Sequence, residues 1–186
     1  MQDRPAAFPR ARTLVHPGPS DAVRIDHMSD ARGRHFRLSL PSGETIHDAL
    51  VDALAQEGVT SASMTLLGGD LQDLGFCLAQ PDPSGRRVAM YGPPHSESQA
   101  RLIFGNATLG KTAEGTPTVH CHAAFRTADG TVRGGHILTD RTRVGRAPIT
   151  VVVNALDSFE LRIGFDEETC MPLMRPHKRS TDVRTV

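Results

Sequence analysis

The stretch Val119–Leu138 reads VHCHAAFRTADGTVRGGHIL and holds three of the nine histidines in the chain. Residues that favour strands flank a segment containing Gly130, a pattern that indicates two strands joined by a turn. Side chains alternate along a strand, so His120 and His122 share one face while Cys121 faces the other way. We interpret this stretch as a β-hairpin that presents imidazoles on one face.

The position of the third histidine, His136, depends on the length of the turn. With the two-residue loop Asp129-Gly130, Ile137 would face His122, and the third histidine would point away. With the three-residue loop Ala128–Gly130, His136 lies directly across from His122, at roughly 5 Å between Cβ atoms. This second hairpin is common, and its last position needs the positive φ that glycine adopts readily. In the second register all three imidazoles lie close together.

Three clustered imidazoles at His120, His122 and His136 predict a divalent-metal site. The alternative is a hydrogen-bonded polar cluster, because protonated imidazoles repel one another and buried ones need partners. Imidazole ligands favour zinc, with manganese, iron and nickel as alternatives. Three ligands leave at least one coordination position open, so a small molecule could bind the metal and be activated there. The sequence names no reaction and leaves open whether the protein is an enzyme.

Several residues are candidates for contacting a bound substrate. Gly134 and Gly135 have no side chains beside His136, which leaves room for a ligand or a neighbouring chain. Candidates for a base or a substrate clamp are Glu97, Arg101, His95 and Arg133.

Composition indicates one domain without a bias toward nucleic acid. The 186 residues include 21 Lys plus Arg and 21 Asp plus Glu, so the formal net charge is zero with neutral histidines. A nucleic-acid-binding domain usually carries a basic excess. The three cysteines lack paired spacing, so we expect them to be reduced in a cytoplasmic protein. The N-terminus lacks the apolar stretch of a secretion signal, and the longest apolar run, Ile149–Val153, is too short to span a membrane.

One segment has the pattern of an amphipathic helix. Thr45 can cap its start together with Asp48, and Gly58 can end it. Apolar residues recur between these limits at helical spacing, at Ile46, Ala49, Leu50, Ala53 and Leu54.

Strand patterns occur on both sides of this helix. Gly105-Asn106 is expected to end or bulge the strand before it. Besides the hairpin, the expected strands cover residues 34–40, 60–67, 74–79, 87–91, 99–104, 149–156 and 159–165. Many short strands around one helix predict an α+β domain, with a mostly antiparallel sheet and one main amphipathic helix packed on it.

The ends of the chain lack clear periodicity. We expect an extended N-terminal arm over residues 1–30, a single domain over 31–175 and a C-terminal tail over 176–186. Pro and basic residues from Glu167 onward already suggest a tail. Arg32-Gly33-Arg34 invites comparison with an AT-hook, but the proline that a hook needs is missing, so we interpret it as the entry to a strand.

From about residue 34 to about 175, the chain resembles the plant and prokaryote conserved (PPC) domain, a domain of unknown function also found in plant AT-hook proteins. The matching pieces follow the order of the family: Ser42-Gly43-Glu44, Gly58-Val59, Leu66–Gly69, Gly105-Asn106, His120–Ala123 and Gly134–Ile137.

This resemblance implies an α+β fold that usually assembles as a homotrimer. Prokaryotic members look like small metal-containing proteins, and the family's histidines match His120, His122 and His136. Plant members are linked to DNA binding and transcription. The acidic residue that often opens the strand before Gly-Asn is replaced here by Gln99, with Glu97 nearby, so no acid is carried over to that position.

Three hypotheses follow. The first is a cytoplasmic, trimeric metal protein that binds a small molecule. The second is a DNA-associated regulatory protein, supported by Arg141, Arg143 and Arg146 and by the basic segment Arg175–Arg179. The third is a structural trimer whose histidines bridge subunits.

Overall fold

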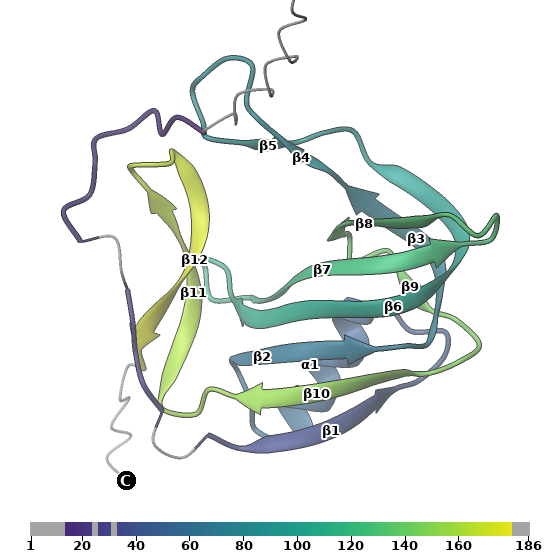
Figure 1. The fold of residues 1–186 in the computed structure, drawn as a ribbon. Coiled ribbons are helices and arrows are strands. Elements are labelled where there is room, and N and C mark those ends of the chain that lie inside the picture. Colours follow the sequence, from purple (N-terminus) through teal and green to yellow (C-terminus); the bar gives the residue numbers. More distant parts are fainter. Residues whose placement is uncertain (1–13, 24–25, 31–32, 180–186) are drawn as a thin grey trace, which may run out of the picture.

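The computed structural model describes residues 14–23, 26–30 and 33–179 (Figure 1). This part of the chain forms strands paired mainly in antiparallel fashion and a single helix, which confirms the predicted α+β class. The elements are β1 His35–Leu40, α1 Ile46–Gln56, β2 Ala62–Leu67, β3 Asp70–Cys77, β4 Ala79–Gln80, β5 Met90–Tyr91, β6 His95–Lys111, β7 Pro117–Thr127, β8 Val132–Ile137, β9 Arg143–Val144, β10 Ile149–Ala155, β11 Phe159–Asp166 and β12 Met171–Lys178.

The helix α1 forms where its pattern predicted it. The Thr45 hydroxyl accepts a hydrogen bond from the backbone N–H of Asp48 at 3.0 Å, which caps the first turn. Gly58 follows the last turn with a φ of 67°, a left-handed conformation that suits glycine. The apolar stripe is buried against the sheet, through Ile46, Ala49, Leu50 and Leu54. Over the described residues, no helix has the length and apolar character needed to cross a membrane.

The main sheet is organised around the long strand β6. One edge of β6 pairs with β7, and the other edge pairs first with β3 and then with β2. Strand β7 pairs in turn with β8, and β8 pairs with β3, so β3, β6, β7 and β8 close into a ring. Strands β10 and β1 extend the sheet beyond β2, and α1 lies behind this part in Figure 1. One face of the sheet therefore contacts the helix, and the opposite face is left to carry polar side chains.

The prediction that Gly105-Asn106 ends or bulges its strand was wrong. Strand β6 continues through both residues to Lys111, and its irregularity lies earlier, between Leu102 and Phe104. A Cβ at Gly105 would lie 3.1 Å from the Cβ of Ala123 on β7. The glycine therefore serves the close approach of two strands and does not interrupt pairing.

The expected strand over residues 87–91 is also shorter than predicted. Only Met90–Tyr91 is extended, and it pairs with Ala79–Gln80 in a separate two-stranded ladder. This small hairpin, β4–β5, lies at the top of Figure 1, outside the main sheet.

The segment after Glu167, which suggested a tail, forms β12 and pairs along its whole length with β11. The arm before the domain is extended over its described part and runs beside this hairpin (Figure 1). His16 contacts the Glu168 carboxylate at 2.6 Å, and the Gly18 N–H donates to the Glu168 carbonyl. Residues 1–13 and 180–186 lie outside the described residues, so the domain boundaries stay a prediction.

Candidate metal centre

The hairpin of β7 and β8 has the three-residue turn. Gly130 adopts a φ of 88°, and the Thr127 N–H donates to the Thr131 carbonyl at 2.9 Å. The Asp129 carboxylate accepts from the Thr131 N–H at 3.0 Å and fixes the turn further. His122 consequently pairs directly with His136 across the ladder, which confirms the second of the two predicted registers.

The three imidazoles gather on one face. Ring centroids of His120 and His122 lie 4.9 Å apart, those of His120 and His136 lie 4.8 Å apart, and those of His122 and His136 lie 5.3 Å apart. One ligand nitrogen from each ring lies within 4.8 Å of the other two. A tetrahedral zinc ion with bonds of about 2.0–2.1 Å needs nitrogens about 3.3 Å apart, so the three rings would have to move closer together to hold the ion.

An unpartnered nitrogen supports the fit of a cation to this cluster. Within the described ranges, the only buried side-chain nitrogen or oxygen without a hydrogen-bond partner is Nδ1 of His136. Buried polar atoms are almost always hydrogen-bonded, so an orphan in a three-histidine cluster is the kind of atom that a ligand satisfies. The residues present therefore fit a divalent metal ion.

Electrostatics keep two of the three imidazoles in the form that binds metals. The pKa of His136 is lowered to about 4, mainly by burial and additionally by the neighbouring His120 and His122. Burial, with a contribution from His122, also lowers the pKa of His120. These two imidazoles are neutral near pH 7 and have a free nitrogen lone pair.

Polar residues of β6 flank the histidines. Asn106 lies directly across the ladder from His122, and Thr108 lies across from His120. Directly opposed residues point to the same face of a sheet, so an amide and a hydroxyl border the imidazoles. Sequence reasoning did not select either residue, although Gly105-Asn106 was already noted.

Tyr91 is a second residue that sequence reasoning missed. Its ring stacks on the imidazole of His136, with centroids 4.5 Å apart and planes inclined by 23°. It reaches the cluster from the β4–β5 hairpin, and burial raises the pKa of its phenol, with a smaller effect from Cys77. Cys77 of β3 pairs with His136 from the other edge of β8. No spacing along the sequence relates Tyr91 to the histidines, because its position depends on how a separate hairpin folds back.

The two glycines proposed beside the ligand lie within the sheet. Gly134 pairs with Ala124 and Gly135 with Ala123 on β7. A Cβ at Gly135 would lie 2.7 Å from the carbonyl oxygen of Cys77. The space next to this glycine is thus occupied by strand β3, whose backbone approaches closely.

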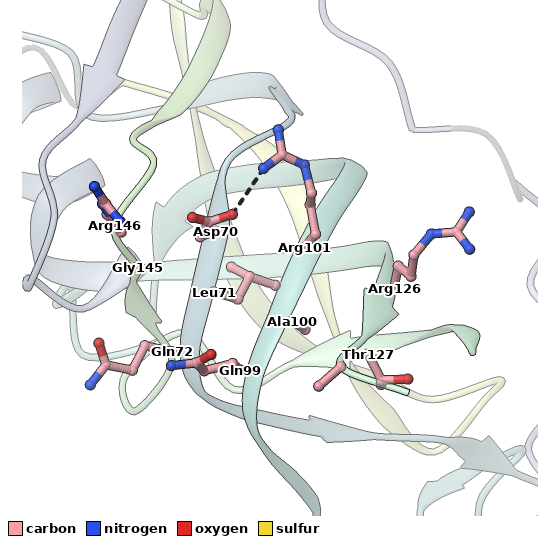
Figure 2. Close-up of a pocket in the computed structure, with 11 residues that line it drawn as sticks. Asp70, Leu71, Gln72, Gln99, Ala100, Arg101, Arg126, Thr127, Gly145 and Arg146 are labelled. Atoms are coloured by element: carbon pink, nitrogen blue, oxygen red, sulfur yellow. Dashed lines mark hydrogen bonds and ion pairs between the residues drawn. The ribbon is translucent and has the colours of Figure 1, made fainter. Parts of the chain in front are cut away.

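The other proposed substrate contacts lie on different parts of the fold. Arg101 forms an ion pair with Asp70 at 3.1 Å and lines a separate hollow, shown in Figure 2. Glu97 pairs with Leu74 in the β3–β6 ladder. His95 stacks on Phe76, and Arg133 pairs with Phe125. Neither His95 nor Glu97 groups with the three histidines as a further metal ligand.

Comparison with known proteins agrees with this fold. The family model for the Plants and Prokaryotes Conserved (PCC) domain matches residues 27–157. A comparison with curated protein sequences finds no match.

Several solved structures share the fold at low sequence identity. A metal-containing protein from Archaeoglobus fulgidus is 17% identical, with a TM-score of 0.62, over 82% of this chain and 99% of that chain. A plant- and prokaryote-conserved protein from Pyrococcus horikoshii is 17% identical, with a TM-score of 0.60, over 82% of this chain and 100% of that chain. A proposed DNA-binding protein from Ralstonia eutropha is 19% identical, with a TM-score of 0.60, over 74% of this chain and 88% of that chain.

Proposed function

The chain belongs to the Plants and Prokaryotes Conserved domain family, and on this basis we propose that it is a metal protein that binds a small molecule at its ion. His120, His122 and His136 hold the ion, with zinc as the first choice because all three ligands are imidazoles. The observation that carries the proposal is the unpartnered Nδ1 of His136 inside a cluster of three rings. The similar protein from Archaeoglobus fulgidus, described as metal-containing, supports it.

The open coordination position is the proposed place of the small molecule. A bound zinc ion would supply a Lewis acid there, which polarises a carbonyl, carboxylate or water. Asn106 and Thr108 provide hydrogen-bonding groups along one side, and Tyr91 covers His136. The cluster found among the described residues contains imidazoles alone, without a carboxylate that could serve as a base. The proposal is therefore limited to binding at the ion.

We propose a homotrimer as the assembled form. Leu67 and Phe104 pair across β2 and β6 on the face that carries Asn106, and their exposed fractions are 40% and 49%. Apolar side chains exposed next to a ligand site favour coverage by another subunit. In the alternative assembly the histidines bridge two subunits around one ion.

We also propose a cytoplasmic location, which is consistent with three unpaired cysteines.

Metal analysis tests the function directly. Protein purified without chelators is expected to contain zinc or another divalent metal, and zinc added to metal-free protein should raise its melting temperature. His122→Ala should abolish both effects, whereas His177→Ala, which changes an exposed histidine on β12, should keep them. Wild-type protein without metal and without a response to zinc would overturn the proposal.

The same variant separates the two assemblies. If each subunit holds its own ion, His122→Ala gives a metal-free protein that is still a trimer by light scattering. If the histidines bridge subunits, the substitution dissociates the trimer.

DNA binding is the second candidate, favoured by the description of the similar protein from Ralstonia eutropha. Two of the arginines expected to support it already contact their own chain. Arg141 donates to the Ser96 hydroxyl at 3.5 Å, and Arg143 donates to the Gly43 carbonyl at 2.8 Å. A gel-shift titration across salt concentrations tests this candidate, because phosphate contacts make binding fall steeply with ionic strength. Absence of binding at low salt would exclude it.

A further inference from the structure

A hollow lies on the main sheet, lined by residues other than the three histidines. It has a volume of about 500 Å³ and is bordered by strands β3, β6 and β7 and by the segment after β9. Figure 2 shows Arg146 on one side, Arg126 on the other, and the Asp70–Arg101 pair between them. Its volume lies within the range of small-molecule sites.

The register of the strands explains why arginines meet here. Asp70 pairs with Arg101 across β3 and β6, and Arg101 pairs with Arg126 across β6 and β7. Opposed residues share a face, so one row of side chains crosses three strands. Gln72 and Gln99 form the next row on β3 and β6.

Arg146 is the fourth charged residue of this hollow, and the backbone on either side of it contacts Asp70 closely. The Gly145 N–H donates to the Asp70 carbonyl at 2.7 Å, and the Ala147 N–H donates to the Asp70 carboxylate at 3.0 Å. A Cβ at Gly145 would lie 2.8 Å from the Cβ of Asp70, so only glycine permits this approach. These contacts hold Arg146 at the rim.

The charges of this row are not balanced within the chain. Three arginines and one aspartate line this hollow, and the Arg101 and Arg126 positions place like charges opposite each other, which destabilises a ladder. Arg126 donates to the Gly130 carbonyl at 3.1 Å. The Arg146 guanidinium has no hydrogen-bond or ion-pair partner in the part of the chain that the structure describes. Most of the donors in this row are therefore free to bind an anion.

We propose that this hollow binds a ligand carrying two or more phosphate groups in series. A guanidinium group binds phosphate through two parallel hydrogen bonds. Neighbouring strands lie about 4.8 Å apart, so guanidinium groups spread over several strands match several anionic groups better than one. The amides of Gln72 and Gln99 can hydrogen-bond the rest of the ligand. The source of the phosphates is either a small molecule or the backbone of a nucleic acid.

Binding of pyrophosphate, orthophosphate and a short DNA duplex to the full chain at low salt, without added metal, tests this proposal. Calorimetry gives the affinity, and amide chemical shifts locate the site. Pyrophosphate is expected to bind more tightly than orthophosphate and to shift the amides around Arg101. The double substitution Arg126→Gln and Arg146→Gln should weaken binding about tenfold or more, because charge-assisted hydrogen bonds are lost.

Two controls define the outcomes. Arg37→Gln removes an exposed arginine on β1 and should leave the affinity unchanged. His122→Ala should also leave it unchanged, because the metal site is separate; loss of binding in this variant would overturn the proposal without affecting the proposed metal function. Duplex binding with the same arginine dependence, but no pyrophosphate binding, would identify nucleic acid as the source. A double variant that binds like wild type would overturn the proposal. A wild-type protein that binds neither pyrophosphate nor the duplex would overturn it as well.

Discussion

Tyr91 stacks face to face on His136, although the two residues come from different hairpins. The ring centroids lie 4.5 Å apart, and the planes are inclined by 23°. This contact joins the small β4–β5 ladder to the histidine cluster and limits how the His136 ring can turn. Tyr91 thereby acts as a positioning residue for a ligand of the proposed metal.

Because Tyr91 is the only tyrosine and the chain has no tryptophan, its fluorescence reports on this site alone. Zinc binding to His136 is expected to change the tyrosine emission, with a midpoint that matches the zinc affinity measured by calorimetry. Tyr91→Ala should weaken zinc binding by roughly two- to tenfold, since an aromatic pair contributes about 0.5–1.5 kcal/mol. Tyr91→Phe keeps the ring and should bind like wild type. An unchanged emission together with an unchanged affinity of Tyr91→Ala would contradict a positioning role.

Acid is expected to destabilise the metal-free protein through the cluster. The pKa of His136 is lowered from 6.5 to about 4, so the unfolded chain binds protons more readily than the folded chain in this interval. The stabilising contribution is therefore complete above about pH 6.5 and is lost as the pH falls toward about 4. The lowered pKa of His120 acts in the same direction.

Urea unfolding between about pH 7 and pH 4 measures this effect. His136→Gln should make the free energy of unfolding less dependent on pH than in wild type, and His177→Gln should leave the dependence unchanged. Equal slopes for wild type and His136→Gln would show that the imidazole is not shielded in solution.

The turn at Gly130 is expected to control both stability and metal binding. Its φ of 88° is unfavourable for any residue with a Cβ, so Gly130→Ala should destabilise the protein by about 1–2 kcal/mol. If the turn relaxes to two residues, His136 moves away from His122 and zinc affinity falls. Gly164→Ala is the control, because a Cβ there meets nothing within 4 Å. Urea unfolding and zinc titration test this, and a Gly130→Ala protein equal to the control would refute it.

Gly135 is expected to allow the close packing of β8 against β3 and not to provide space for a ligand. A Cβ would lie 2.7 Å from the carbonyl oxygen of Cys77 and 3.1 Å from Cδ2 of Phe76, so Gly135→Ala must displace β8 from β3. We expect a loss of about 1–3 kcal/mol in the free energy of unfolding, as for overpacking in a core. Zinc affinity should fall as well, since His136 is the next residue on β8. A stable Gly135→Ala protein that binds zinc like wild type would instead favour the open space first expected from the sequence.

Local chemistry explains which parts of the fold could be predicted. The helix α1 followed from its cap at Thr45, its apolar stripe and Gly58, all of which act within a few residues. The strand pairing of β7 and β8 followed from one glycine in the turn. Strand β12 was missed because its prolines and charges resemble a tail, and only pairing with β11 makes it a strand. Strand β6 was cut short because a glycine in a strand can mark either a break or a close contact with another strand.

By itself, the sequence determined the class of the fold, the helix α1 and the set of three histidines, because alternation, capping and turn geometry are local properties of the chain. Only the tertiary structure decided what surrounds those histidines. Tyr91 reaches His136 through the fold of a separate hairpin, and Arg101 is paired with Asp70 in a different hollow. Contacts of this kind depend on strands that meet after long excursions of the chain, and residue spacing contains no information about where such strands meet.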